Sequence, residues 1–359
     1  PPMRPSGALP SRRPRSSRKT DVAAGAPAHE RLEHGLLPFL QAQLPAAQDL
    51  ALHDIRRTSS GKSRENWVFD ASWHERGAPH RLSLILRRDP TDSVLRTERR
   101  IEFGVLAALA GSTLPAPRVH FLDEDGSQLG RPSLVMERID GDCDWELLNG
   151  SAPLAERLDL AHRLLALLAD VHAVDWRARG LDGVLGHPGP RPGLTELARW
   201  EAELRRVQLE PHPELEIVID WLRRHCAPQA DTVLVHGDFK PGNVLLRGNR
   251  IVALLDWETA HLGDPLEDLG WMLNPTRARE HQIAGHWERA QVVAQYQRLT
   301  GRSVDPDALH WWIVFANFKL AVIVLTGVKA YLDGGLDQAY LGPTWIIRTL
   351  MRTLRQSRA

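Results

Sequence analysis

The most informative residues are a polar loop and the acid that follows it in the second half of the chain. The loop reads His-Gly-Asp-Phe-Lys-Pro-Gly-Asn over residues 236–243, and Asp256 comes after two short apolar runs, 244–246 and 251–255. The runs are separated by a segment that contains Gly-Asn, which is typical of a β-hairpin. Because paired strands lie about 5 Å apart, Asn243 and Asp256 should lie side by side, with Asp238 on the loop entering the hairpin.

Two carboxylates and one carboxamide oxygen at one place form a set of hard oxygen ligands. Such ligands suit a Mg²⁺ ion that holds phosphates. A single Asp or Asn most often only forms a turn. Asp238, Asn243 and Asp256, however, occur in order around one predicted hairpin. We therefore expect a centre that binds magnesium and phosphate there.

The elements that must position this centre fall into two parts of an α+β protein. Residues 29–139 alternate β-like runs at 65–73, 82–88, 118–122 and 133–139 with a helix-period stretch at 93–109. Residues 140–359 are mainly helical, with helices expected at 155–175, 196–207, 213–224, 280–299 and 307–325. The hairpin at 244–255 is the exception in this second part.

Residues 1–28 stand apart from both parts. They are rich in arginine, have no acid before Asp21 and show no apolar period. Such a segment cannot bury enough surface to offset the entropy of ordering it, so we expect a disordered basic tail. A transit peptide shares this Arg- and Ser-rich, acid-poor composition and is the alternative, although the amphipathic period is missing.

Composition narrows the classes of function. The 45 Lys and Arg residues equal the 45 Asp and Glu residues, so charge indicates neither nucleic acid nor an anionic membrane as a partner. Two cysteines exclude a disulfide framework and a Cys-rich metal site, and they favour a reducing compartment, which we expect to be the cytoplasm. The apolar stretch 311–328 contains Asn317 and Lys319, which favours a buried helix over a membrane span. Nothing in the sequence indicates the oligomeric state.

The polar loop also carries a family resemblance. The spacing His236-x-Asp238-x₄-Asn243, followed by Asp256-Trp-Glu, resembles the catalytic and metal loops of protein-kinase-like enzymes. The run 234–271 resembles the aminoglycoside phosphotransferase and choline kinase superfamily. Gly237 stands where a protein kinase has Arg, and no Ala-Pro-Glu follows, which argues against a protein kinase.

A second resemblance is narrower. Leu-Arg-Arg at 86–88, Pro-Ala-Pro at 115–117 and the helix at 310–332 resemble the kinase-like domain that accompanies some acyl-CoA dehydrogenases. Together the resemblances cover about residues 35–350. They imply a two-lobed protein-kinase-like fold, with a small mixed β-sheet in the N-lobe and a larger, mainly helical C-lobe. Residues 29–139 would be the nucleotide-binding lobe and 140–359 the catalytic and acceptor-binding lobe.

The resemblance also implies roles for the loop residues. Asp238 would be the catalytic base for the acceptor hydroxyl, and Lys240 would contact the transferred phosphate. Asn243 and Asp256 would hold Mg²⁺. His236 would anchor the loop. Asp264 and Asp268 resemble the acids that brace its backbone, with a helix N-cap as the alternative for Asp264.

In the N-lobe the resemblance implies the residues that hold the nucleotide, ATP, with GTP as the open alternative. Arg87 would bind the α and β phosphates, paired with Glu102 or, one turn earlier, Glu98. Glu137 and Ile139 belong to the hinge whose backbone meets the adenine edge. Ser63, in the single-glycine turn at 59–63, is the expected phosphate contact. A P-loop would need Gly where Arg56 stands, which excludes that motif.

The acceptor is expected to be a small molecule with a hydroxyl group. From residue 271 onward, eleven Lys and Arg face six Asp and Glu, which disfavours a polycation. Members of the acyl-CoA dehydrogenase-associated group phosphorylate hydroxylated acyl groups, so the resemblance ranks such a compound first. An aminoglycoside or other antibiotic comes second, and choline or another small alcohol third. A catalytically silent nucleotide-binding scaffold is the rival from another class.

Three tryptophans, two histidines and one cysteine of the C-lobe also allow predictions. Trp271, Trp311 and Trp312 are candidates for lining an acceptor pocket, against a plain role in the core. His281 and His286 lack the spacing of a zinc pair and are expected on the surface. The pair Asp142-Cys143 is expected in a loop.

Overall fold

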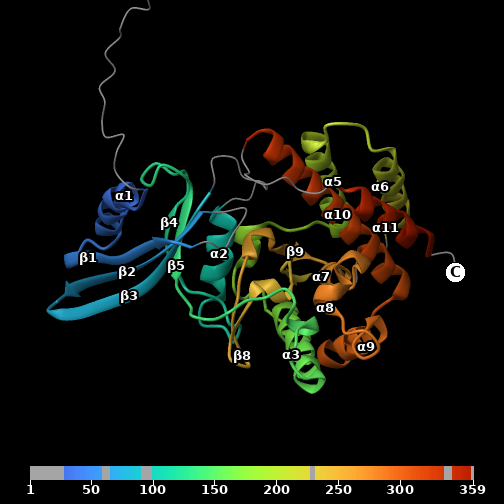
Figure 1. Ribbon diagram of the computed structural model, residues 1–359, viewed down its shortest axis with the longest axis horizontal. Coiled ribbons are helices and arrows are strands. Elements are labelled where there is room, and N and C mark those ends of the chain that lie inside the picture. Colours follow the sequence, from blue (N-terminus) through green and yellow to red (C-terminus); the bar gives the residue numbers. More distant parts are fainter. Residues whose placement is uncertain (1–27, 59–64, 90–98, 227–230, 335–341, 357–359) are drawn as a thin grey trace, which may run out of the picture.

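The computed structural model describes residues 28–58, 65–89, 99–226, 231–334 and 342–356 (Figure 1). The basic tail expected over 1–28 lies outside these ranges except for its last residue, which begins a helix. Ser63 and Glu98 also lie outside the described residues. The structure therefore gives no position for the expected phosphate contact or for the alternative partner of Arg87.

A five-stranded sheet forms the smaller lobe. Its strand order is β1-β2-β3-β5-β4, and each neighbouring pair is antiparallel, where a mixed sheet was expected. The strands are β1 (Gln48–Arg57), β2 (Glu65–Glu75), β3 (Ala78–Arg88), β4 (Val119–Asp123) and β5 (Ser133–Glu137). Consecutive strands connected by short turns pair antiparallel, because only a longer crossover permits parallel pairing.

Two helices lie on this sheet. α1 (Ala28–Gln43) packs Leu36, Phe39 and Leu40 into a core shared with the side chains of β2 and β3. α2 (Arg99–Leu109) instead turns Val105, Leu106 and Leu109 into the core of the larger lobe. Figure 1 shows α2 between the sheet and the helices of the larger lobe. The helix that carries Glu102 therefore lies at the junction of the lobes.

Neither α1 nor β1 was expected from the sequence. β1 contains two residues with positive φ, Asp49 and Asp54, and its register with β2 shifts twice. These irregularities break the period-2 alternation by which a strand is recognised in a sequence.

Helices dominate the larger lobe. They are α3 (Leu154–His172), α4 (Leu181–Leu185), α5 (Pro192–Val207), α6 (Pro213–His225), α7 (Leu266–Met272), α8 (Ala278–His281), α9 (Arg289–Thr300), α10 (Pro306–Leu332) and α11 (Thr344–Arg355), with short 3₁₀ turns among them. α10 runs through the middle and contacts α5, α6, α7 and α11. By length and composition α10 is apolar enough to cross a membrane, but most of it is buried inside the protein.

The helix expected over 280–299 is interrupted. α8 ends at His281 and α9 begins only at Arg289. Gly285 has φ of 74°, a left-handed conformation that stops a helix. Glu288 then starts the next helix through a capping box with Gln291, which satisfies N–H groups at the new N-terminus.

Short strands frame the polar loop. β6 (Val233–Val235) precedes it and pairs with β9 (His261–Gly263). β7 (Val244–Arg247) and β8 (Arg250–Leu254) form the expected hairpin, in which Val244 faces Leu254. The prediction of a hairpin immediately after the loop is confirmed.

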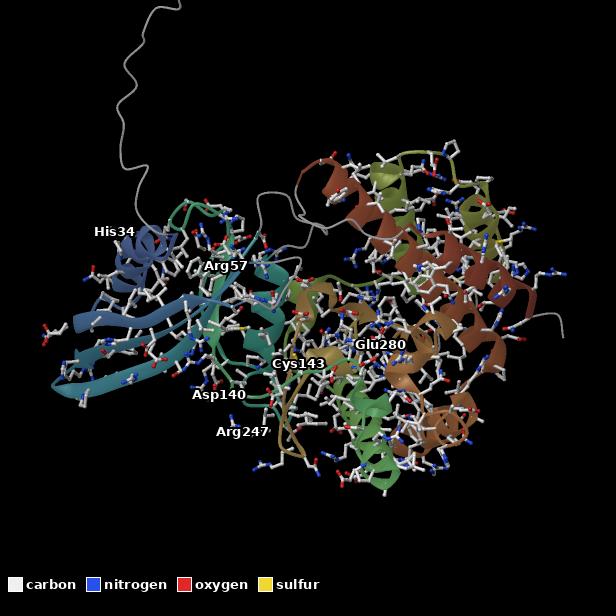
Figure 2. The ribbon with its side chains drawn as sticks, viewed as in Figure 1. His34, Arg57, Asp140, Cys143, Arg247 and Glu280 are labelled. Atoms are coloured by element: carbon white, nitrogen blue, oxygen red, sulfur yellow. The ribbon has the colours of Figure 1, made fainter. Side chains whose placement is uncertain are left out.

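The segment that leaves the sheet is held on this hairpin. Asp142 and Leu246 exchange backbone hydrogen bonds of 2.9 and 2.8 Å. The guanidinium of Arg247 donates to the carbonyl oxygen of Asp140, and Figure 2 shows these two residues together below the sheet. The connection between the lobes is thus tied to the strands that position Asn243 and Asp256.

A close contact between α7 and α10 gives a test of the fold. A Cβ atom added at Gly270 would lie 2.8 Å from both the carbonyl carbon and the Cβ of Trp312. Overpacking of this kind costs about 1–3 kcal/mol, so we expect Gly270→Ala to lower the free energy of unfolding in urea by that amount. Gly183→Ala, where nothing lies within 4 Å, should leave stability unchanged or slightly higher. Equal stability of the two variants would contradict the α7–α10 contact.

Candidate active site

The structure brings Asp238, Asn243 and Asp256 to the open end of the hairpin. The N–H of Leu255 donates to the carbonyl oxygen of Asn243 at 2.8 Å, which holds Asp256 beside the start of β7. The amide nitrogen of Asn243 donates to the carbonyl oxygen of Asp238 at 3.0 Å and to its carboxylate at 3.1 Å. The three side chains expected to converge do so.

Lys240 lies directly on Asp238. Its ammonium group donates to the carboxylate at 2.5 Å. Burial would raise the pKa of Asp238, but the positive charges of Lys240 and Arg277 outweigh it and lower that pKa below its usual value. The carboxylate is therefore ionised at neutral pH, in the state that can accept a proton.

Arg87 joins the sheet to the helical lobe. It donates to Glu102 at 2.5 Å and to Asp256 at 2.6 Å, and Glu102 is fully buried. Burial opposes the charge of the guanidinium, yet the two carboxylates raise the pKa of Arg87. Glu102 is also bound by Arg99, which in turn donates to Asp89. The pairing of Arg87 with Glu102, the first of the two partners considered, is present.

Asp268 holds the backbone of the polar loop. Its two oxygens accept the N–H groups of His236 and Gly237, each at 2.8 Å. The Nε2 atom of His172 donates to the same carboxylate at 3.2 Å, and its Nδ1 atom contacts the Tyr296 hydroxyl at 2.7 Å. Burial would raise the pKa of Asp268, but hydrogen bonds and charge from His172 and His236 lower it to about 2. This is the bracing role expected for Asp268.

Asp264 and His236 have local roles. Asp264 accepts the N–H of Leu266, the first residue of α7, at 2.8 Å, but Pro265 and not Asp264 is the N-cap residue. The Nε2 atom of His236 contacts the carbonyl oxygen of Leu255 at 2.9 Å, and its ring packs on Trp257. His236 therefore fastens the loop to the end of the hairpin.

Gly237 cannot carry a side chain here. Its φ is 80°, and an added Cβ would lie 2.7 Å from the carbonyl oxygen of Thr259. Both the left-handed backbone and the close approach require glycine. This accounts physically for the departure from the arginine of protein kinases at this position.

Lys319 is a buried residue of the site that sequence reasoning did not assign to it. Its ammonium group donates to the carbonyl oxygen of Gly237 at 2.7 Å and lies 3.3 Å from Glu267. The rings of Trp200 and Trp271 lie 5.3 and 5.1 Å from the same nitrogen, in cation–π contact. A lysine in the middle of a long apolar helix was the available signal, because a buried ammonium must find acceptors.

Glu267 extends this contact into a buried cluster with Glu196 and His261. His261 contacts Glu267 at 2.9 Å and lies 4.0 Å from Glu196, a grouping compact enough to hold a metal ion. Burial alone would lower the pKa of His261, but the two carboxylates outweigh burial and raise that pKa to about 9. A protonated His261 and Lys319 therefore balance the two carboxylates without an ion.

The three tryptophans considered for the acceptor pocket differ in their surroundings. Trp311 packs between α5 and α6 and donates to the carbonyl oxygen of Leu222 at 2.9 Å, and Trp312 lies against Gly270. Both belong to the core. Trp271 is also buried, and the guanidinium of Arg277 lies 4.6 Å from the centre of its ring.

Glu137 and Ile139 lie where the sheet ends. Glu137 is the last residue of β5 and is exposed, and its N–H donates to the carbonyl oxygen of Arg118 at 2.8 Å. Arg138 donates its N–H to Ser83 at 2.9 Å, which keeps the chain beside β3. Ile139 begins the connection to the helical lobe, the position of a hinge.

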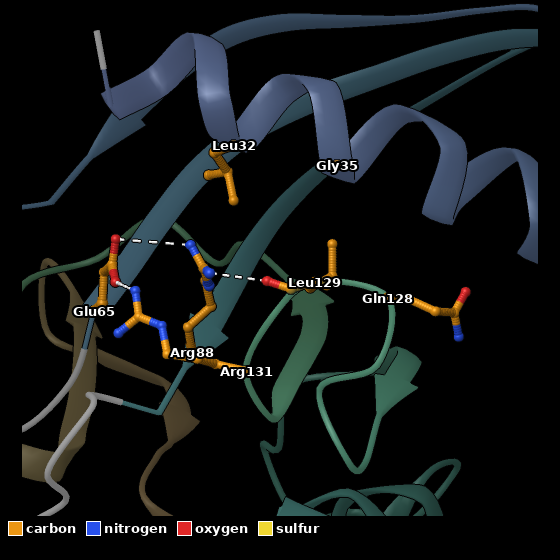
Figure 3. Close-up of a pocket in the computed structure, with 7 residues that line it drawn as sticks. All are labelled: Leu32, Gly35, Glu65, Arg88, Gln128, Leu129 and Arg131. Carbon is orange, nitrogen blue, oxygen red and sulfur yellow. Dashed lines mark hydrogen bonds and ion pairs between the residues drawn. The ribbon is translucent and has the colours of Figure 1, made fainter. Parts of the chain in front are cut away.

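A cavity of about 350 Å³ lies on the other side of the sheet (Figure 3). It is lined by Leu32, Gly35, Glu65, Arg88, Gln128, Leu129 and Arg131. Successive residues of a strand point to opposite faces, so Arg88 faces this cavity and Arg87 faces Asp256. None of the expected site residues lines it, and it is separate from the candidate active site.

A small antiparallel sheet, a helical lobe and a His-x-Asp-x₄-Asn loop at their junction define the class of protein-kinase-like phosphotransferase folds. The chain belongs to the phosphotransferase enzyme family, whose model matches residues 54–312. The resemblance stated from the sequence is confirmed.

Two acyl-CoA dehydrogenase family members match most of this chain. Mouse acyl-CoA dehydrogenase family member 10 is 33% identical over 71% of this chain, and human member 11 is 25% identical over 90%. The chain spans only 25% and 42% of the length of these two relatives. The second, narrower resemblance is therefore confirmed as well.

Solved structures confirm the kinase-like fold. A Ralstonia eutropha protein described as a candidate aminoglycoside phosphotransferase aligns with a TM-score of 0.68 and 24% identity, over 90% of this chain and 98% of its own. An aminoglycoside phosphotransferase mutant in complex with ADP and hygromycin B aligns with a TM-score of 0.56 and 18% identity, over 90% and 99%. Macrolide 2′-phosphotransferase from Brachybacterium faecium aligns at 0.52 and 21%, over 88% and 97%.

The buried charge cluster predicts a pH dependence of stability. The pKa of His261 is raised from 6.5 to about 9 on folding, so its contribution is fully present below pH 6.5 and is lost as the pH rises to 9. That contribution is about 3 kcal/mol at most. We expect the free energy of unfolding, measured in urea, to fall over this interval in the wild type and to be nearly flat in His261→Gln. A parallel fall in both proteins would contradict the assignment.

Proposed function

We propose that this protein transfers the γ-phosphate of ATP to a hydroxyl group of a small molecule, with Mg²⁺ as the metal. The observation that carries the proposal is one cluster at the junction of the lobes. In it Asp238 is ionised and held by Lys240 and Asn243, and Arg87 reaches Asp256 from the sheet. Family membership supports the chemistry, and the preferred acceptor is a hydroxylated acyl compound.

Asp238 acts as the base in this proposal. Its carboxylate accepts the proton of the acceptor hydroxyl while the acceptor oxygen bonds to the γ-phosphorus. The bond from that phosphorus to the bridging oxygen breaks, and ADP leaves with the bonding electrons. Lys240 shares a hydrogen bond with Asp238 and contacts the transferred phosphate, whose charge its ammonium group offsets.

The metal ligands are Asn243 and Asp256. The amide nitrogen of Asn243 is committed to Asp238, which leaves its carbonyl oxygen as the ligand atom. Asp256 is ionised, because Arg87 and Lys240 outweigh the effect of burial and lower its pKa. The donor set therefore fits Mg²⁺, which in bound form would neutralise phosphate charge.

The sheet supplies the nucleotide contacts. Arg87 is aligned by Glu102 and binds the α and β phosphates after exchanging its bond to Asp256. Ser63 contributes a phosphate contact, and the backbone of Glu137 and Ile139 meets the adenine edge. The neighbour solved with ADP supports an adenine nucleotide, and GTP is the alternative to be measured.

The charge of the larger lobe and the relatives of this chain support the proposed acceptor. Basic residues outnumber acidic ones after residue 271, and the curated relatives are acyl-CoA dehydrogenase family members. An aminoglycoside is the second candidate, because the structural neighbours include a complex with hygromycin B. A silent scaffold is less consistent with the site, since each polar group needed for transfer is present.

Substitution of the base separates catalysis from binding. We expect Asp238→Asn to lower the rate of ADP formation by about 100- to 10,000-fold, since a general base contributes that much, while ATP affinity changes only several-fold. Asp220→Asn, on the exposed face of α6, is the control and should keep full activity. Wild-type turnover by Asp238→Asn, measured by coupled ADP release, would refute the assignment of the base.

Substitution of the metal ligand tests the Mg²⁺ site. Asp256→Ala should lose the Mg²⁺-dependent part of ATP binding in calorimetry, and its kinetic effect should not add to that of Asp238→Asn, because the groups act together. Undiminished dependence on Mg²⁺ in Asp256→Ala would show that the metal binds elsewhere.

The acceptor class is tested by a panel. ADP release is measured with ATP and GTP across hydroxyacyl, aminoglycoside, macrolide and amino-alcohol acceptors, with Asp238→Asn as the blank. We expect the hydroxyacyl compounds to give the highest kcat/KM. Activity with an antibiotic alone would replace the acyl assignment. Silence across the panel, with tight binding of ATP and Mg²⁺, would favour the scaffold.

A further inference from the structure

Arg277 lies between two helices of the larger lobe. It follows α7 and precedes α8, with its guanidinium stacked on Trp271 and its Nη2 atom donating to Glu280 at 2.5 Å. The side chain is only 11% exposed. His281, one turn further on, was expected at the surface and is instead buried.

These side chains share an electrostatic environment with the polar loop. The charge of Arg277 acts on Asp238 and helps to lower its pKa. Burial lowers the pKa of His281 well below its usual value, and the positive charges of Arg277 and Lys240 lower it further. Arg277 and His281 are thus close enough to Asp238 and Lys240 to share one electrostatic environment.

The segment that carries them is fixed. The amide nitrogen of Asn149 donates to the carbonyl oxygens of Arg279 and Gln282, each at 2.7 Å. This clamps α8 to the short helical turn 147–149. Arg277 and His281 are therefore presented by a constrained piece of backbone, as a binding group requires.

Three buried nitrogens at this place have no hydrogen-bond partner among the described residues. They are Nε of Arg277, Nε1 of Trp271 and Nε2 of His281. An unsatisfied buried polar group costs about 1–3 kcal/mol, so a ligand that supplied acceptors to these three nitrogens would recover that free energy. Arginine and tryptophan nitrogens only donate, and a neutral histidine nitrogen can donate, so the partner must supply acceptor oxygens.

We infer that Arg277, Trp271 and His281 form a subsite for an oxyanion on the acceptor, a carboxylate or a phosphate. This inference rests on the proposed function and adds that the hydroxyl acceptor is an anion. Glu280 accepts a hydrogen bond from Nη2 of Arg277, whereas the Nε–H of the same guanidinium has no partner among the described residues and can donate to the ligand. Arginine presents paired donors that match the oxygens of either group.

The test compares acceptors that share one hydroxyl and differ in charge. They are a hydroxy fatty acid, its methyl ester and the same chain ending in a phosphate monoester. We expect the wild type to prefer one of the two anions over the ester, and the preferred one identifies the natural group. A charge-assisted hydrogen bond of about 1.5–3 kcal/mol corresponds to a loss of roughly 10- to 150-fold. Arg277→Gln should show that loss in kcat/KM, mainly through KM, for the anions only.

Matched variants separate binding from structure. Arg279→Gln, at an exposed arginine two residues away that pairs with Glu146, should leave all three acceptors unchanged. Arg277→Lys should recover part of the affinity for the anion, and thermal melting checks that each variant is folded. Equal losses on the acid, the phosphate and the ester in Arg277→Gln would overturn the subsite, as would a wild type that does not distinguish them.

Binding is measured apart from turnover. Calorimetry with the ATP-saturated Asp238→Asn protein should detect the acid or the phosphate, and the double variant with Arg277→Gln should lose that binding. If no acceptor is phosphorylated but this Arg277-dependent binding persists, the proposed function fails and the subsite stands. Binding that is equal with and without Arg277, or absent in both, overturns the subsite whether or not transfer occurs.

Discussion

Two opposite charges buried beneath the polar loop hold its backbone on both sides of Gly237. Asp268 accepts the N–H groups of His236 and Gly237, and Lys319 donates to the carbonyl oxygen of Gly237. A charge removed from water must be paired, so α7 and α10, which carry these residues, cannot shift without leaving one of them unsatisfied. The position of Asp238 is therefore set by helices far from it in sequence.

Buried charges are also paired at the junction of the lobes. Arg87 comes from the sheet, Glu102 from the helix behind it and Asp256 from the end of the hairpin in the larger lobe. One guanidinium thus orients carboxylates from both lobes. Because Arg99 and Asp89 continue the chain of ion pairs, Glu102 keeps its place whether or not Arg87 is bound to Asp256.

The features of the fold and the site that could be predicted from the sequence depend on short-range patterns. The hairpin and the convergence of Asn243 with Asp256 depend on turn chemistry and strand spacing, which can be recognised within a few residues. The pairing of Arg87 with Glu102 was implied by the family resemblance, with Glu98 as the alternative. The cluster of Glu196, His261, Glu267 and Lys319 joins residues up to more than a hundred positions apart, and no local pattern encodes it. The break before α9 was missed because a single glycine and a capping box outweighed an otherwise helical period.

The bond between Arg87 and Asp256 has a consequence for opening and closing. Its two partners belong to different lobes, so the bond favours the arrangement in which the lobes are in contact. Under the proposed function, Mg²⁺ would give Asp256 and the phosphates would give Arg87 a partner of opposite sign, which would compensate for breaking the bond. After ADP leaves, the guanidinium and the carboxylate would pair again, and this pairing would compete with rebinding of the nucleotide. The rate of product release would therefore depend on the strength of one ion pair between the lobes.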